Sequence, residues 1–166
     1  MDNEKVIVEA LAKRAKPRVK MVKGKTKRKK LEKLSTIQNR LMKLWLQRTY
    51  DIYDHKCAIC GDPVKPNAHH IVNRDISPAL RFDPNNSIAL CSRCHKFSLK
   101  SAHKNGVWFA SWLREHAPMQ HDYILSHTDD RINIRDREVL YKLEANLKQP
   151  ITSEERLFHG QQDDQY

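Results

Sequence analysis

The sequence predicts an α+β fold in which two short strands and a helix share one metal site, with further α-helices on both sides. Two observations carry this prediction. Four cysteines stand in two C-x-x-C pairs separated by 30 residues, and the apolar residues around this region recur at helical spacing. The chain has 166 residues and a hydrophobic content of 39%. These values suit one domain with a modest core, which a bound metal would stabilise.

Residues 1–30 are predicted to form a basic arm. Residues 13–30 hold 11 Lys or Arg and no acidic residue, in a chain whose net charge is +11. We expect the arm to be mobile without a ligand, because it has few apolar side chains to bury, although residues 1–12 suit a short helix. The charge favours a polyanionic partner, with a solvated tail or an anchor to acidic lipid as the alternatives.

Residues 31–54 are predicted to form an amphipathic helix. Its apolar positions recur at spacings of three, four and seven, and comprise Leu31, Leu34, Ile37, Leu41, Leu44, Trp45 and Ile52. The opposite face carries Lys33, Arg40, Lys43 and Arg48. The apolar stripe is interpreted as core. The basic face is either a solvated surface or a surface that contacts nucleic acid.

Residues 55–106 are predicted to hold two strands and a helix. Gly61 allows the turn of the first cysteine pair, and a strand is expected at residues 68–72. A loop rich in Pro, Asn and Asp then leads to a short apolar strand at residues 87–90. A helix is expected to begin near Ser92.

The cysteines Cys57, Cys60, Cys91 and Cys94 predict a structural zinc site. Four thiolates in two C-x-x-C pairs suit a closed tetrahedral site, which leaves no position for water. The alternatives are four buried or reactive thiols, or a site in which His69 or His70 replaces one cysteine. The sequence shows no secretory signal and no apolar run that could span a membrane. We therefore expect thiolate ligands rather than disulfides, and a cytoplasmic protein.

Residues 107–150 are predicted to form C-terminal helices. One amphipathic helix follows Gly106 and closes at Pro118, and a second covers residues 136–148. Residues 151–166 are polar and are predicted to be a disordered tail.

A further pattern lies within residues 57–105. Adjacent histidines, His69 and His70, stand on the first strand, Asn86 lies five residues before the second cysteine pair, and His95 follows that pair. The segments AHHIVN and DPNNSIALCSRCHK resemble the HNH nuclease family of the ββα-metal class, in its variant with flanking cysteine pairs. This resemblance implies an endonuclease that hydrolyses phosphodiester bonds and leaves 5′-phosphate and 3′-hydroxyl ends.

The resemblance also implies roles for single residues. His70 is the general base, His69 and His95 ligate a divalent metal, and Asn86 orients the strand that bears His70, with Asn85 as the neighbouring alternative. Adjacent residues on a strand point to opposite faces, and a histidine can activate water near neutral pH, so the division of roles is physically reasonable. His103 lies about 12 Å from His95 along an unbroken helix, so it is expected to be a phosphate contact or a surface residue. It can be a further metal ligand only if the helix breaks near Ser98.

The catalytic ion and the partner follow from the same considerations. A ligand set that is mainly nitrogen leaves Mg²⁺, Mn²⁺, Ni²⁺, Co²⁺ and Zn²⁺ open. The expected partner is double-stranded DNA, which a monomer would nick and a homodimer could cut on both strands. The alternatives are a non-catalytic zinc-ribbon protein that binds DNA or RNA, and an RNA-directed nuclease. The expected DNA contacts are Arg14, Lys16, Arg18, Lys20, Lys27, Arg28, Lys29, Lys30, Arg40 and Lys43. The small basic chain would suit a phage or a mobile element.

Overall fold

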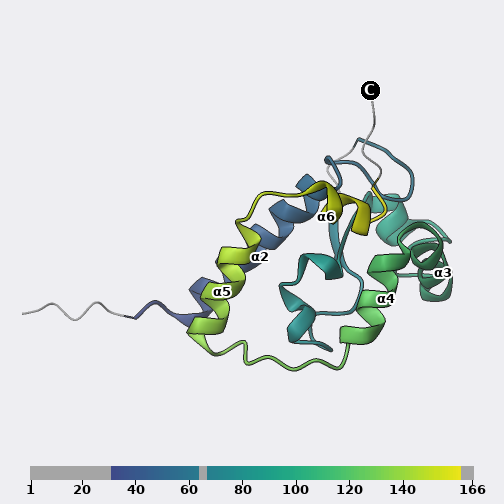
Figure 1. Ribbon diagram of the computed structural model, residues 1–166. Coiled ribbons are helices and arrows are strands. Elements are labelled where there is room, and N and C mark those ends of the chain that lie inside the picture. Colours follow the sequence, from purple (N-terminus) through teal and green to yellow (C-terminus); the bar gives the residue numbers. More distant parts are fainter. Residues whose placement is uncertain (1–30, 64–66, 162–166) are drawn as a thin grey trace, which may run out of the picture. The chain divides into compact units, whose positions relative to one another are not determined.

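The computed structural model describes residues 31–63 and 67–161 (Figure 1). The elements are, in chain order, α2 (Leu34–Ile52), β1 (Asn67–His70), η1 (Ala79–Arg81), η2 (Pro84–Asn86), β2 (Ser87–Leu90), η3 (Arg93–Phe97), α3 (Gly106–His116), α4 (Pro118–His127), α5 (Arg137–Leu147) and α6 (Ser153–Phe158). Two strands among helices confirm the predicted α+β class. The basic arm, with its predicted short helix and its eight predicted DNA contacts, lies outside the described residues.

Strands β1 and β2 form an antiparallel pair in which His69 faces Ile88 and His70 faces Ser87. All four residues of β2 are buried, as the apolar sequence of this strand predicts. Strand β1 ends two residues before the predicted boundary. It stops because the side-chain oxygen of Asn86 accepts the backbone N–H of Val72, at 2.7 Å, in place of a ladder carbonyl.

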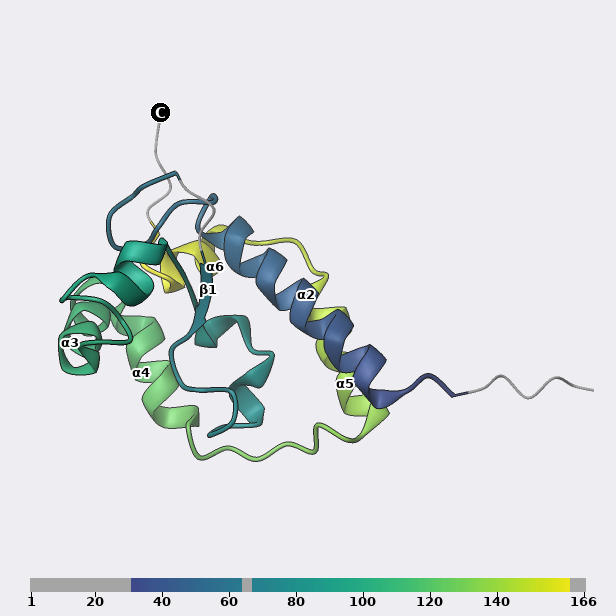
Figure 2. The same cartoon turned by 180° about the vertical axis from the view of Figure 1, so that it is seen from behind.

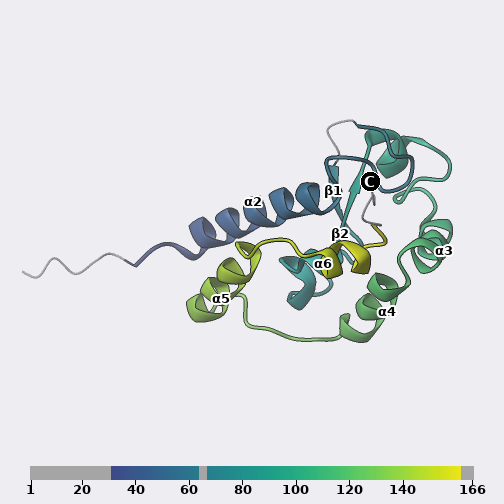
Figure 3. The same ribbon diagram turned by 45° about the horizontal axis from the view of Figure 1, so that its top comes forward.

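Helix α2 contributes to two apolar clusters of the core. Its first part packs through Ile37, Leu41 and Trp45 against residues of α5 and against Phe82. Its end packs through Ile52 against β2 and the cysteine region. Figure 2 shows α2 and α5 side by side, and Figure 3 shows α3 and α4 on the other side of the strands. The helix therefore supports the strands from one side.

The basic face of α2 differs from the prediction. Arg40 donates to both oxygens of Glu144, at 3.0 and 2.9 Å, and to Glu32 at 2.6 Å. Arg48 is buried and donates to Glu155 at 2.8 Å and to the carbonyl oxygen of Gln149 at 2.6 Å. These two arginines join α2 to the C-terminal helices, so the structure does not support Arg40 as a free DNA contact. Lys43 remains exposed.

The prediction of a disordered tail was wrong for residues 151–161. Helix α6 forms there, and the Thr152 hydroxyl caps it by accepting the backbone N–H of Glu155 at 3.2 Å. Arg156 donates to the carbonyl oxygens of Ile52 and Asp51, both at 3.1 Å, at the end of α2. The polar residues of this segment are therefore partners for polar groups of α2 and do not form a solvated chain.

Helix α4 was also missed. In the sequence, Pro118 predicts only the end of the preceding helix. In the structure Pro118 begins α4 directly, because a proline has no backbone N–H to satisfy in the first turn of a helix. Among the described residues no helix has the length and apolar character needed to cross a membrane.

Candidate metal centres and catalytic site

The four cysteines come together as one cluster. Their sulfur atoms all lie within 4.8 Å of one another, and Cys60 Sγ is 3.7 Å from Cys91 Sγ. Gly61 has a φ of +72° and donates its N–H to the Cys57 carbonyl oxygen at 2.8 Å, which closes the first turn. The neighbouring Ala58 N–H donates to the Ala89 carbonyl oxygen at 2.8 Å and fixes this turn to β2.

This cluster fits a zinc ion. A tetrahedral ion with bonds of about 2.3 Å to sulfur requires sulfurs that are about 3.8 Å apart. The separation of Cys60 and Cys91 agrees with this requirement, and three of the four cysteines are buried. An ion held by four protein ligands would have no open position, which suits a structural site.

A second cluster of ligand atoms is formed by three histidines. His95 Nε2 lies 3.0 Å from His69 Nδ1 and 3.0 Å from His103 Nε2, and all three ligand atoms lie within 4.8 Å of one another. Ligand nitrogens about 3.0–3.4 Å apart suit one divalent ion with bonds of about 2.1 Å. The three residues come from β1, from η3 and from the loop after η3.

The position of His103 corrects the prediction of a long helix after Cys94. Helix η3 is a single π-helical turn that ends at Phe97, and Ser98 has an extended backbone with a ψ of 158°. The chain then folds back, because the N–H of Ala102 donates to the Cys94 carbonyl oxygen at 3.0 Å and that of His103 to the His95 carbonyl oxygen at 3.2 Å. The break near Ser98, which the sequence analysis named as the condition, brings His103 beside His95.

The surroundings of His69 and His95 favour neutral imidazoles, which is the form that binds a metal. Burial, together with the charges that His95 and His103 would carry, lowers the pKa of His69 to about 3. Burial, the neighbouring His103 and Lys96 lower the pKa of His95 to about 4. His69 and His95 can therefore bind a cation near neutral pH without first losing a proton.

His70 points away from the other three histidines. Its ring stacks on Trp45 of α2, with the ring centres 3.9 Å apart and the planes 10° from parallel. Its Nε2 lies 2.9 Å from the carbonyl oxygen of Arg81. A carbonyl only accepts hydrogen bonds, so Nε2 carries the proton and Nδ1 holds the free lone pair of the neutral ring. Burial lowers the pKa of His70, and the bond to Arg81 opposes this shift.

Asn86 holds the loop between the two strands. Its amide nitrogen donates to the carbonyl oxygens of Val72 and Leu80, at 2.9 and 3.0 Å, while its oxygen accepts from Val72 N–H. The side chain is fully buried. Asn86 thus fixes the chain just after His70 and near Arg81, whose carbonyl orients the His70 ring. Asn85 makes no such bridge, and its N–H donates to Asp83 at 2.9 Å.

All four histidines border one cleft of about 800 Å³. Arg74 and Lys96 add positive charge to its lining, and Phe109, Leu113 and Ile124 from α3 and α4 add apolar surface. Three candidate metal ligands and His70 therefore border the same cleft.

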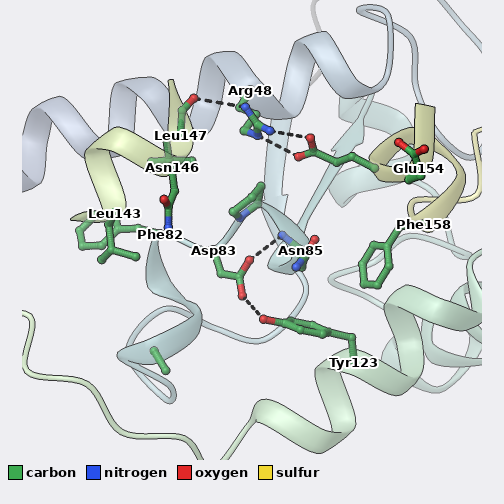
Figure 4. Close-up of a pocket in the computed structure, with 13 residues that line it drawn as sticks. Arg48, Phe82, Asp83, Asn85, Tyr123, Leu143, Asn146, Leu147, Glu154 and Phe158 are labelled. Carbon is green, nitrogen blue, oxygen red and sulfur yellow. Dashed lines mark hydrogen bonds and ion pairs between the residues drawn. The ribbon is translucent and has the colours of Figure 1, made fainter. Parts of the chain in front are cut away.

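A second cavity, of about 550 Å³, is lined by Asp83 and Asn85 of the loop between the strands and by Tyr123 of α4 (Figure 4). Asp83 dominates it: its carboxylate accepts from Asn85 N–H and from the Tyr123 hydroxyl, the latter at 2.7 Å. Burial raises the pKa of Asp83, and burial together with this bond raises the pKa of Tyr123 to about 12. Trp45 Nε1 also donates to the Asp83 carbonyl oxygen at 2.9 Å. Contacts from α2 and α4 therefore fix the loop between the two strands at Asp83.

Gln120 of α4 is a further supporting residue that the sequence did not predict. Its amide nitrogen donates to the carbonyl oxygens of Asn85 and Ser87, at 2.9 and 2.8 Å, on either side of Asn86. The residue is completely buried, and His159 Nδ1 lies 3.0 Å from the same nitrogen. No sequence motif marks this glutamine, because its partners are backbone groups that only the packing of α4 against η2 brings near.

The HNH endonuclease family model matches residues 57–97. This segment is about a quarter of the chain and contains the four cysteines, His69, His70, Asn86 and His95, but it ends before His103. A search of curated protein sequences found no match, and a search of solved structures found none either. The match agrees with the resemblance seen in the sequence, so residues 57–97 of this chain are similar to an HNH endonuclease domain.

Proposed function

We propose that this protein is a metal-dependent endonuclease that hydrolyses phosphodiester bonds of DNA. The observation that supports this proposal best is the cleft itself, which holds a three-histidine cluster and a separately oriented histidine, His70. A metal that only stabilises a fold is usually enclosed by four protein ligands. Three ligands at the edge of a cleft leave positions for water and for a phosphate.

In this proposal His70 acts as the general base. Its Nδ1 lone pair accepts a proton from the attacking water, while the Arg81 carbonyl and the Trp45 ring keep the imidazole in one orientation. Asn86 positions the loop that supplies this carbonyl. A divalent ion bound by His69, His95 and His103 would stabilise charge on the phosphoryl group and on the leaving oxygen. The products would be a 5′-phosphate and a 3′-hydroxyl.

Positive charge supports a nucleic acid as the substrate. Arg74 and Lys96 line the cleft, Lys43 is exposed on α2, and the chain has a net charge of +11. We propose that these residues contact the phosphate backbone of double-stranded DNA together with the arm residues Arg14, Lys16, Arg18, Lys20, Lys27, Arg28, Lys29 and Lys30.

The test is cleavage of supercoiled plasmid by zinc-loaded protein, with Mg²⁺, Mn²⁺, Ni²⁺, Co²⁺ or additional Zn²⁺ supplied separately. Wild-type protein should produce nicked or linear plasmid, and EDTA should stop the reaction. His70→Ala should reduce the rate by about 10²–10⁴-fold, the usual contribution of a general base, while DNA affinity stays within a few-fold.

The matched control is His55→Asn, which changes an exposed histidine that does not line the cleft and whose φ of +56° asparagine tolerates. It should cut like the wild type. DNA binding without cleavage under every metal would contradict the proposal and favour a non-catalytic binding protein. Full activity of His70→Ala would exclude the proposed mechanism.

A further inference from the structure

Two large apolar side chains stand exposed between two of the histidine ligands. Phe97 is 71% exposed and Leu99 is 86% exposed. Both lie on the turn that leads from His95 to His103, and Phe97 follows His95 by two residues, which places their Cα atoms within about 7 Å of each other. This apolar pair therefore lies on the same short segment of chain as two candidate metal ligands, outside the lining of the cleft.

The turn that carries the pair is tightly held. Ser98 N–H donates to the Arg93 carbonyl oxygen at 2.9 Å, and Lys104 Nζ donates to the Phe97 carbonyl oxygen at 3.0 Å. Ser101 and Ala102 are buried beneath the turn, and Ala102 N–H is bonded to the carbonyl of Cys94. The apolar pair thus projects from a frame that the cysteine cluster anchors.

Three exposed lysines lie on the same segment of chain as the apolar pair. Lys96, Lys100 and Lys104 are exposed and recur every four residues on the same turn. Such a segment is complementary to DNA, because apolar side chains can contact the stacked bases while neighbouring lysines contact the phosphates on either side. A symmetric contact with a second copy of this chain would instead bring six lysines together.

We propose that Phe97 and Leu99 form a wedge that contacts the DNA bases next to the phosphate at the three-histidine cluster and partly unstacks them. Lys96, Lys100 and Lys104 bind the phosphates on either side. Apolar wedges between base steps bend the duplex and expose more of its backbone to the protein. The wedge would therefore help to present the scissile phosphate to the cleft. This inference rests on the proposed nuclease function and identifies how its substrate is held.

The test uses full-length protein with His70→Ala, which should bind DNA without cutting it, and short duplexes in which 2-aminopurine replaces adenines along the strand. Unstacking raises the fluorescence of this base. The parent protein should raise it several-fold, and the added pair Phe97→Ser and Leu99→Ser should abolish the rise. The control is Leu157→Ser, which changes a leucine of α6 that is 57% exposed and should leave the rise unchanged.

A second measurement uses an intact His70. The double serine variant should cut a plain duplex at least about tenfold more slowly than wild type, yet cut a duplex with a two-nucleotide bulge at nearly the wild-type rate, because the bulge is already unstacked. Equal zinc content and equal thermal unfolding in wild type and variant check that the fold is retained.

An unchanged fluorescence rise in the double serine variant would overturn the wedge. If the double serine variant keeps the fluorescence rise but no longer forms a dimer, the apolar pair contacts a second copy of the chain instead. If it keeps the rise but no longer binds vesicles of acidic lipid, the apolar pair contacts a lipid surface instead. Wild-type protein that cuts DNA without any fluorescence rise defeats only the wedge. Wild-type protein that neither binds nor cuts DNA defeats the proposed function as well.

Discussion

The four-cysteine cluster draws two ligands from each of two local turns, whereas the three-histidine cluster draws one ligand from each of three segments. The cysteine cluster is mostly enclosed, and the histidine cluster borders a cleft of about 800 Å³. Adjacent residues of η3, Cys94 and His95, contribute to the two clusters. One turn of helix thus belongs to a closed site and to an open one, and the closed site holds the backbone on which the open site is built.

Loss of the cysteine cluster should have the largest effect. Structural zinc contributes about 10–16 kcal/mol in small zinc domains, as much as the whole stability of many domains. Cys91→Ser should therefore lose zinc and cooperative folding together, as measured by native mass spectrometry and by circular dichroism during urea unfolding. Ser92→Ala, next in the chain, should keep both. A zinc-free Cys91→Ser protein that unfolds cooperatively would show that the cysteine cluster does not hold the fold.

Loss of one histidine ligand should spare the fold. His103→Ala and His69→Ala should each retain one zinc and weaken the second metal at least about tenfold, because a ligand is lost from an open site. Isothermal titration with Ni²⁺ or Mn²⁺ measures this change. Excess metal should partly restore cleavage in both variants but not in His70→Ala. If His103→Ala binds the second metal like the wild type, the fold of the chain after Ser98 is not needed for metal binding.

A substitution of Gln120 tests whether hydrogen bonds from α4 stabilise the loop between the two strands independently of the metals. Gln120→Leu removes the donor shared by the carbonyls of Asn85 and Ser87 and should lower the free energy of unfolding by about 1–3 kcal/mol. Both metals should remain bound. Urea unfolding at constant zinc measures the loss, and Gln47→Leu, at an exposed glutamine of α2, is the control. A loss no larger than that of the control would remove the case for this support.

The smallest effect concerns pH. His159 is buried away from both clusters, and burial, together with the charge of Arg48, lowers its pKa to about 3. The unfolded chain takes up a proton near pH 6.5, and the folded chain takes it up only near pH 3, so stability falls as the pH falls through this interval and is unaffected above it. Between pH 5 and 6, His159→Gln should make the free energy of unfolding depend less steeply on pH. The reduction should be up to about one proton, or about 1.4 kcal/mol per pH unit. Identical slopes for the two proteins in urea unfolding would show that His159 does not contribute.

The comparison of the two clusters also separates what was predictable. The cysteine cluster could be predicted from the sequence, because the two cysteines of each pair are three residues apart and a local turn suffices to bring them together. His69, His70, Asn86 and His95 were recognisable because the HNH resemblance depends on their order in the sequence. The apolar spacing of α2 and the four residues of β2 were equally local signals, and both elements were found close to their predicted positions.

The remaining features depend on tertiary contacts. His103 joins the cluster because the chain turns at Ser98, and this turn depends on backbone bonds back to Cys94 and His95. Arg40 and Arg48 look like partners for DNA in the sequence, yet residues about 100 positions away supply carboxylates that bind them. The sequence by itself thus determined the ligand types and the helical and strand patterns, since these rest on local spacing. Only the tertiary structure decided which charges are paired and which distant groups meet, since a charged or polar residue has no preferred partner until packing brings one within hydrogen-bonding distance.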